Sequence, residues 1–234
     1  PKVYSRERLH KAEPVIDMDG VQGGIEYSDA YVVDNDSRFV FGFVRGALNV
    51  GAACANYVEL TNATRDSRGW SAELTDTDTG DTFTCKARVI VNAAGPFVDD
   101  LNSQLGIESK HQIVFSKGIH LIVPRIVSNE KVLAFFDDTE RLFYVIPMGS
   151  RSVIGTTDER VVDPVTQVDE EDRDFLLEQI NKRLDLPKPL TPDDIISTRC
   201  GVRPLVVERT DNSHTETDWT SPSRKHGLGL DPAG

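Results

Sequence analysis

The stretch Arg88-Val-Ile-Val-Asn-Ala-Ala-Gly-Pro96 is the most informative part of this sequence. Three β-branched residues precede a run of small residues, which predicts a buried strand that ends in a tight turn. Proline suits the first position of a helix, so we expect a helix from residue 96 to about residue 105. In open α/β sheets, ligands bind at the carboxyl ends of strands, and small residues let them approach the backbone. The stretch therefore predicts a ligand-binding edge or, as the alternative, a strand–turn–helix junction whose small residues serve packing.

The residues before this stretch extend the same pattern. Residues 37–55 place apolar side chains at close to helical spacing, which predicts a helix with a buried face. Residues 55–64 alternate and favour a strand, and residues 70–74 and 82–87 predict a hairpin around a short turn. Residues 1–36 are polar and turn-rich and are interpreted as a connecting arm.

After residue 107 the sequence changes to short strands with one clear helix. We expect strands at residues 119–126, 131–136, 141–147, 151–157 and 195–207. Residues 169–184 predict a helix, because acidic residues fill the first turn, basic residues fill the last, and apolar residues share one side. The pattern thus predicts an α/β layer over residues 37–106, followed by an antiparallel sheet with a covering helix over residues 107–207.

Composition limits the classes of function that remain. The chain has 234 residues, enough for one or two domains, and 26 basic against 38 acidic residues give a formal charge of −12. An acidic chain repels phosphate backbones and no basic patch offsets this, so we expect no nucleic-acid partner. Three widely spaced cysteines without a C-x-x-C pair argue against a disulfide scaffold or zinc ribbon, and we expect no metal site. No apolar run approaches the roughly 18 residues of a membrane-spanning helix.

Beyond these patterns, the opening stretch resembles a known family. Extended to Asp99, it is similar to the strand-to-turn segment of the FAD-dependent, quinone-linked glycerol-3-phosphate dehydrogenases, which are D-amino-acid-oxidase-like flavoproteins. Five further segments resemble this family in the same order. They are Gly51-Ala-Ala-Cys-Ala-Asn-Tyr57, Lys117-Gly-Ile-His-Leu-Ile-Val-Pro-Arg125, Phe143-Tyr-Val-Ile-Pro147, Ile154-Gly-Thr-Thr-Asp158 and Gly201-Val-Arg-Pro-Leu205.

The resemblance implies a reaction and a division of the chain. The reaction is oxidation of sn-glycerol 3-phosphate to dihydroxyacetone phosphate, with hydride transfer to FAD and onward transfer of electrons to quinone. It implies an α/β plus α+β fold, in which residues 37–106 form a partial Rossmann-like FAD-binding domain. Residues 107–207 would form an antiparallel-sheet substrate domain, or cap, and residues 208–234 a polar tail that leads back to the FAD domain.

The resemblance also implies roles for individual residues. Arg203 matches the arginine that binds the substrate phosphate, and its planar guanidinium suits paired contacts with phosphate oxygens. Its alternative interpretation is an ordinary ion pair. Ala93, Ala94 and Gly95 would contact the flavin through their backbone, and Leu60 would lie on the adenine side.

Two further residues are candidates because of their chemistry. His120 is a candidate catalytic residue, because histidine titrates near neutral pH, although a histidine within a strand can equally be structural. Lys117 is a candidate substrate-binding cation, and its alternative is a solvated lysine.

One feature of the family is absent from the sequence. The G-x-G-x-x-G turn that binds the cofactor phosphates does not occur, so we expect an interior part of the family's sequence. On this basis the 234-residue chain alone should be inactive and should bind FAD weakly or not at all. The alternatives are a glycerol-3-phosphate oxidase, an amine or amino-acid oxidase of the same superfamily, or an inactive truncated binding module.

The resemblance sets the remaining expectations about partners and location. We expect glycerol 3-phosphate as substrate and quinone as electron acceptor, and a homodimer is left open. The expected location is the cytoplasm, with peripheral contact at the inner face of the cytoplasmic or inner mitochondrial membrane. Any membrane contact should involve parts outside this chain, since no basic amphipathic helix is visible.

Overall fold

The computed structural model describes residues 1–30, 32, 35–209 and 229, which form two compact units. The first unit contains residues 1–26, residues 94–99 and the described residues from 109 onward. The second unit contains the described residues between 27 and 93, together with residues 100–108. Most of the predicted polar tail, residues 208–234, lies outside the described residues.

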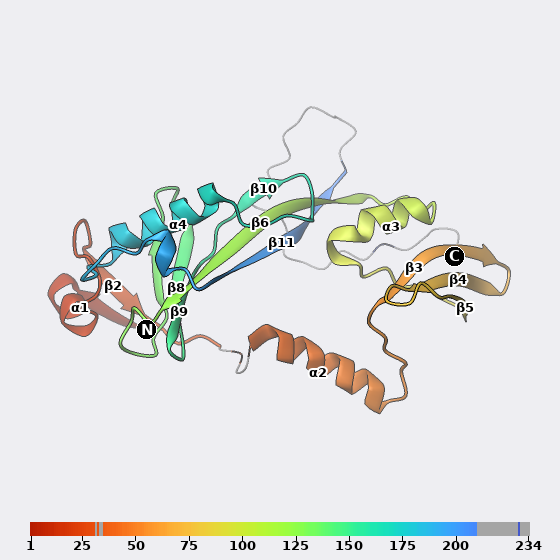
Figure 1. The fold of residues 1–234 in the computed structure, drawn as a ribbon, viewed down its shortest axis with the longest axis horizontal. Helices are drawn as coiled ribbons and strands as arrows, with labels where there is room; N and C mark the ends of the chain where they lie inside the picture. Colours follow the sequence, from red (N-terminus) through yellow and green to blue (C-terminus); the bar gives the residue numbers. More distant parts are fainter. Residues whose placement is uncertain (31, 33–34, 210–228, 230–234) are drawn as a thin grey trace. The chain divides into compact units, whose positions relative to one another are not determined.

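A six-stranded antiparallel sheet is the main feature of the first unit (Figure 1). Its long strand β6 (His111–Pro124) pairs along one edge with β11 (Ser197–Glu208). Along the other edge, β6 pairs with β10 (Glu159–Val161) and then with β9 (Arg151–Gly155). The sheet continues through β8 (Leu142–Met148) to β7 (Leu133–Phe136). The antiparallel sheet predicted for this half of the chain is therefore present.

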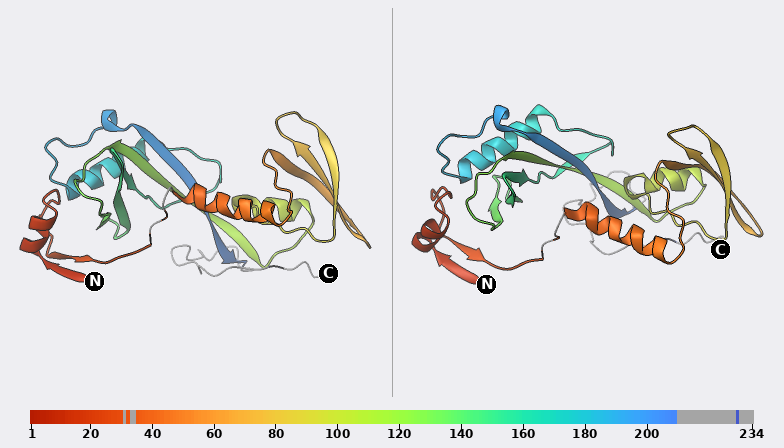
Figure 2. Two further views of the ribbon diagram at one scale, coloured as in Figure 1. Left: turned by 90° about the horizontal axis from the view of Figure 1, so that it is seen from below. Right: turned by 60° about the horizontal axis from the view of Figure 1, so that its bottom comes forward.

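Helix α4 (Glu170–Arg183) packs against one face of this sheet (Figures 1 and 2). Asp169 and Asp172 form a capping box, in which each side chain accepts a hydrogen bond from the backbone N–H of the other. The core between helix and sheet is formed by buried apolar side chains, including Ile119, Leu121, Ile154, Leu176 and Ile180. The predicted helix over residues 169–184 is confirmed.

The first 26 residues belong to the first unit, although the sequence suggested a connecting arm. Strands β1 (Lys2–Ser5) and β2 (Gly23–Glu26) pair with each other and enclose α1 (Arg6–Ala12) along the chain. The buried residue Ile16 bridges to Leu184 at the end of α4. A short 3₁₀-helix, η2 (Pro192–Asp194), precedes β11.

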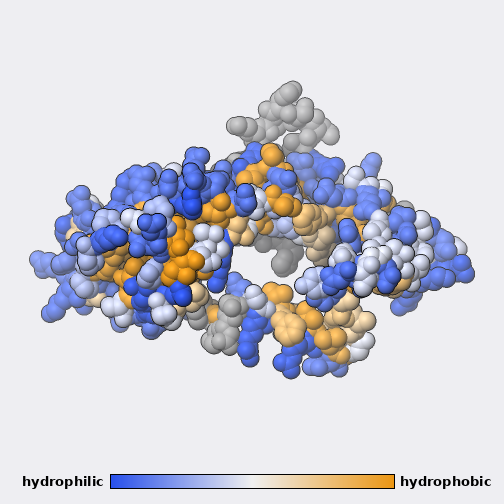
Figure 3. All heavy atoms as spheres, viewed as in Figure 1, coloured by the Kyte–Doolittle hydropathy of each residue, from blue (hydrophilic) through white to orange (hydrophobic). Residues whose placement is uncertain are grey.

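The second unit contains a three-stranded antiparallel sheet and helix α2 (Asn35–Asn49). Its strands are β3 (Val58–Asp66), β4 (Gly69–Asp76) and β5 (Thr82–Ala87), close to the predicted strand and hairpin. The predicted buried face of α2 is not buried, since Phe39 is 58% exposed and Phe43 is 68% exposed. Apolar side chains accordingly gather at the surface over α2 (Figure 3).

The predicted buried strand over residues 88–92 does not form. Val89 and Val91 are 70% and 81% exposed, and no described strand pairs with this segment. A β-branched run becomes a strand only when a neighbour satisfies its backbone groups, and the sequence pattern does not supply that neighbour. The predicted helix after Pro96 is present as η1 (Gly95–Phe97) and α3 (Val98–Gln104). No helix in the described part of the chain is long and apolar enough to cross a membrane.

Candidate functional site

The two faces of the six-stranded sheet differ sharply, because successive residues of β6 point to opposite sides. Ile119, Leu121 and neighbouring odd-numbered residues are buried in the core under α4. Ser116, Gly118 and His120 lie on the opposite face, together with the residues that pair with them. We call this side, which α4 does not cover, the open face.

Arg203 of β11 lies on the open face, directly opposite Ser116 of β6. Its Nη2 donates to Thr156 Oγ1 at 2.9 Å, and its Nη1 lies 3.4 Å from both Ser116 Oγ and the Thr157 carbonyl oxygen. Its Nη1 also lies 3.7 Å from Asp158 Oδ1. These contacts hold the guanidinium in place, yet the side chain remains 42% exposed and can meet an external anion.

A glycine makes room for this guanidinium. A Cβ atom at Gly118 would lie 2.5 Å from Arg203 Nη2 and 2.7 Å from both Arg203 Nη1 and Thr156 Oγ1. The Arg203 side chain therefore leans over Gly118, towards His120. Gly201, which pairs with Gly118, is exposed, and a Cβ there would meet no atom within 4 Å. Arg203 fills the space above Gly118, so Gly201 alone forms a glycine floor on which a ligand could approach the sheet backbone.

Asp158 supports the arginine from the loop between β9 and β10. It accepts a hydrogen bond from the fully buried Ser116 hydroxyl and lies within ion-pair distance of Arg203. Arg141 donates to the Asp158 backbone carbonyl and approaches its carboxylate at 3.9 Å. One carboxylate thus lies between two arginines, which leaves excess positive charge at this end of the open face.

His120 lies beside Arg203 along the same face. It pairs with Gly155 of β9 on one side and with Arg199 of β11 on the other. Burial, followed by the positive charges of Arg199 and Arg203, lowers the pKa of His120 below its ordinary value. The imidazole is therefore neutral at pH 7 and able to accept a proton.

Lys117 lies on the opposite face from Arg203 and His120, which argues against the predicted substrate-binding role. Its Nζ contacts Glu159 at 2.7 Å, Asp172 at 2.9 Å and Asp169 at 3.1 Å, and its side chain is 4% exposed. Burial by itself would lower the pKa of Lys117, but the hydrogen bonds to these carboxylates outweigh it and raise the pKa. Lys117 therefore joins β6 to β10 and to the first turn of α4.

The predicted cofactor-binding residues fall in both units. Leu60 on β3 and Ala93 belong to the second unit, and Ala94 and Gly95 belong to the first. Gly95 has a φ of +58°, and a Cβ there would meet no atom within 4 Å, so this turn is open to a ligand. Such a backbone fits the close approach of one part of FAD. The G-x-G-x-x-G turn for the cofactor phosphates does not occur in the sequence, so the residues present fit only part of FAD.

Several contributors to the site were missed in the sequence. Gly118 and Asp158 lie inside segments that showed the family resemblance, but their function depends on pairing with β11, which begins 39 residues after Asp158. Ser116 and Arg199 lie just outside those segments. A register between the two strands would have found Ser116, Gly118 and Arg199, since it places Ser116 opposite Arg203 and His120 opposite Arg199, whereas Asp158 lies in the β9–β10 loop outside that register.

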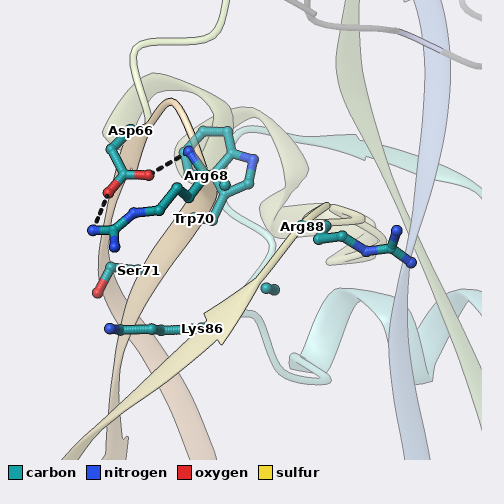
Figure 4. A pocket seen from close by; sticks show the side chains of 8 residues that line it. Asp66, Arg68, Trp70, Ser71, Lys86 and Arg88 are labelled. Carbon is teal, nitrogen blue, oxygen red and sulfur yellow. Dashed lines mark hydrogen bonds and ion pairs between the residues drawn. The ribbon is translucent and has the colours of Figure 1, made fainter.

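A hollow in the second unit is less suited to a ligand. It has a volume of about 230 Å³, below the roughly 300–1,000 Å³ of ligand pockets, and lies at the paired ends of β4 and β5. Arg68 lies close to Asp66, with Nη2 and Oδ2 3.4 Å apart, and Arg88 points away from the other side chains (Figure 4). In the described residues, no cluster of His, Cys, Asp and Glu is placed to hold a metal ion.

The chain matches one family model and several characterised relatives. The model for FAD dependent oxidoreductases, DAO, matches residues 1–220. The aerobic glycerol-3-phosphate dehydrogenase of Escherichia coli is 33% identical over 205 residues, covering 86% of this chain and 40% of the relative. The D-erythritol 1-phosphate dehydrogenase of Brucella abortus is 32% identical over 215 residues, covering 90% of this chain and 42% of the relative.

A solved structure agrees with these sequence relatives. The glycerol-3-phosphate dehydrogenase of Bacillus halodurans, complexed with FAD, superimposes with a TM-score of 0.81 at 28% identity. The match covers 88% of this chain and 42% of that one. The chain thus spans about 40% of the length of the curated relatives that it matches. The family match over most of the chain, together with this fold, shows that the chain belongs to the DAO family of FAD dependent oxidoreductases.

Proposed function

We propose that the open face binds the phosphate of sn-glycerol 3-phosphate through Arg203, in a flavoprotein that oxidises this substrate to dihydroxyacetone phosphate. The observation that carries the proposal is the position of Arg203. Its guanidinium is held above Gly118 by contacts with Ser116, Thr156 and Asp158, and the Arg203 side chain remains 42% exposed. A fixed planar donor of this kind suits a phosphate group.

The neighbouring residues support an alcohol oxidation. With the phosphate on Arg203, a three-carbon chain over the glycine floor would bring its hydroxyl to the level of His120, about 7 Å along the strand from Gly118. Neutral His120 would accept the proton of the hydroxyl on the second carbon. When bound, FAD supplies the acceptor for the hydride that leaves the same carbon. The hydroxyl oxygen thereby loses a proton and the carbon loses a hydride, and the alcohol becomes the ketone.

Steady-state kinetics of the protein expressed from its complete reading frame and loaded with FAD would test this function. We expect turnover of glycerol 3-phosphate, and a rise of about tenfold to a hundredfold in its KM for Arg203→Gln, because hydrogen bonds to charged groups contribute about 1.5–3 kcal/mol. The matched control is Arg68→Gln, which removes the same charge from a side chain that is 86% exposed in the second unit. Equal kinetics in both variants would contradict the role of Arg203.

The electron acceptor and the membrane contact belong to the same proposal. We propose quinone as the acceptor, with oxygen as the alternative that would make the protein an oxidase. Assays with each acceptor in turn separate the two. Peripheral contact with the quinone-bearing membrane, through surfaces outside this chain, is proposed on the same family grounds, and a homodimer is left to a measurement of mass in solution.

The 234-residue chain alone is proposed to be inactive. The support is the lack of a G-x-G-x-x-G turn in the sequence, which removes the usual seat of the cofactor phosphates. After incubation with excess FAD and gel filtration, we expect the purified chain to show no stoichiometric flavin absorbance. A spectrum with one bound flavin per chain would overturn this expectation.

A further inference from the structure

The open face has a charge pattern that binding of one phosphate does not explain. Its strands carry four arginines and His120, and none of their residues on this face is acidic. The arginines are Arg151 on β9, Arg160 on β10, and Arg199 and Arg203 on β11. In a chain of formal charge −12, a face whose strands contribute four arginines and no acidic residue, with Asp158 of the β9–β10 loop beside Arg203, is suited to anions.

The four arginines differ in how they are neutralised. Arg203 is within ion-pair distance of Asp158. Among the described residues, Arg151 and Arg199 have no carboxylate within ion-pair distance, and Arg199 Nη2 contacts Met148 Sδ at 4.0 Å. Their guanidinium groups therefore retain their full positive charge on the same face as the glycine floor.

The order of these groups along the sheet separates two cationic ends. The Arg203 guanidinium leans over Gly118, and the next open-face residue of β6 is His120. The backbone of Arg199 pairs with His120, and its side chain extends to Met148. Met148 of β8 pairs with Arg151 of β9, which in turn pairs with Pro124 at the end of β6. Along β6 the sequence of groups is thus Arg203, His120 and then Arg199 with Arg151.

The distance along β6 decides which ligands can reach from Arg203 to Arg199 and Arg151. Two residues of an antiparallel strand span about 7 Å, so a phosphate on Arg203 places the second carbon of the substrate at the level of His120. A group that reaches Arg199 must continue beyond the carbon that faces His120. A planar, oxygen-rich anion is the partner that a guanidinium binds best.

We propose that Arg199 and Arg151 form a second anion subsite, which makes the protein select phosphorylated sugar acids of at least four carbons over glycerol 3-phosphate. The phosphate lies on Arg203, the chain crosses the open backbone at Gly201, and the distal carboxylate meets Arg199. The inference rests on the proposed function for the phosphate end only. Arg199 is a specificity-determining residue in this arrangement, and His120 lies between the two anionic ends.

NMR titration of the full 234-residue chain tests the subsite with three probes: inorganic phosphate, glycerol 3-phosphate and 4-phosphoerythronate. We expect the four-carbon acid to bind at least about tenfold more tightly than glycerol 3-phosphate, because a charged hydrogen-bonded pair is added. In Arg199→Gln this advantage should disappear, while the affinities for phosphate and glycerol 3-phosphate stay within about twofold. Arg203→Gln should weaken all three ligands.

The contradicting outcomes are distinct. The subsite is refuted if Arg199→Gln leaves the preference for the four-carbon acid intact, or if it weakens all three ligands equally. Failure of the proposed function would be seen in a different experiment, as absence of turnover of glycerol 3-phosphate by the FAD-loaded protein. That result would leave unchanged the ratio of the affinities for 4-phosphoerythronate and glycerol 3-phosphate. Absence of any binding by the wild-type chain would overturn the anion site at both ends. Arg68→Gln serves as the charge-matched control, and it should behave as the wild type.

Discussion

Gly118 and Gly155 both lie beside the candidate site, but an added methyl group should have different effects at the two positions. At Gly118 the new Cβ meets Arg203 and Thr156 side-chain atoms, and the flexible guanidinium can move away. At Gly155 the new Cβ would lie 2.7 Å from the Ile119 backbone oxygen and 2.6 Å from His120 Cδ2. A backbone atom in a paired strand cannot move aside, whereas the end of a long side chain can.

We therefore predict that Gly118→Ala separates binding from stability. Its free energy of unfolding should change by less than about 1 kcal/mol, while its affinity for phosphate falls about tenfold because Arg203 is displaced. Gly155→Ala should lose about 1–3 kcal/mol of stability. Urea unfolding and phosphate titration of both variants check this. A Gly118→Ala protein with wild-type phosphate affinity would disprove the displacement of Arg203.

The protonation of His120 gives a second prediction at the scale of single residues. Burial and the charges of Arg199 and Arg203 lower its pKa, so NMR titration of the imidazole should give a value below about 6.5. In Arg199→Gln the pKa should rise, although burial keeps it below the ordinary value. Because the folded state resists protonation, this group reduces stability as pH falls below about 6.5, where the unfolded chain binds the proton first. A pKa above 6.5 in the wild type would be inconsistent with the charges assigned to the open face.

The residues of the site that lie in short sequence motifs were predictable, and those placed by strand pairing were not. Arg203 and His120 belong to short motifs that can be recognised along the chain. Ser116 and Gly118 owe their positions to the pairing of β6 with β11, which brings Ser116 opposite Arg203, 87 positions further along the chain. Lys117 was a candidate for binding the substrate because of its positive charge. The alternation of β6 turns it to the other face.

At the scale of elements, one buried lysine joins α4 to the sheet in addition to the apolar core between them. Lys117 contacts Asp172, whose side chain is 5% exposed, and also the half-exposed Asp169 and Glu159. We predict that Lys117→Met costs about 3 kcal/mol of stability in urea unfolding, because it leaves Asp172 buried without its partner. Glu159→Gln, which alters an exposed partner, should cost less than about 1 kcal/mol. Similar losses in the two variants would show that burial of the lysine is not decisive.

Helix α2 provides the opposite case, an element that forms without burying its apolar residues. Phe39 and Phe43 stack edge to face at 5.2 Å and are both more than half exposed. We predict that Phe39→Ser with Phe43→Ser lowers binding of a hydrophobic dye and raises solubility, while stability changes by less than about 1 kcal/mol. A large loss of stability would mean that this face packs against the chain in solution.

Local pattern identified most of the elements, and tertiary context decided the rest. The helix over residues 169–184 was predictable because charge and apolar periodicity agree. Residues 88–92 have the composition of a strand but remain unpaired, because composition does not supply a neighbouring strand. The short elements β1, α1 and β2 were not predicted, since four- and seven-residue elements leave too little periodicity to detect.

For the whole molecule, the formal charge of −12 is a poor guide to the ligand. The open face concentrates arginines, whereas carboxylates such as Asp169 and Asp172 lie at the α4 side of the sheet. Local fields decide what binds, and they weaken as salt screens the exposed charges. Anion binding to this acidic chain should therefore persist at low ionic strength and weaken as salt is added.

The central claim is that Arg203 on the open face binds a phosphorylated substrate. The most direct measurement is an NMR titration of the 234-residue chain with glycerol 3-phosphate, following the amide signals of Ser116, Gly118 and Gly201. We predict shifts confined to the open face, an affinity reduced about tenfold or more in Arg203→Gln, and an unchanged affinity in Arg68→Gln. Shifts that lie elsewhere, or that survive unchanged in Arg203→Gln, would contradict the claim.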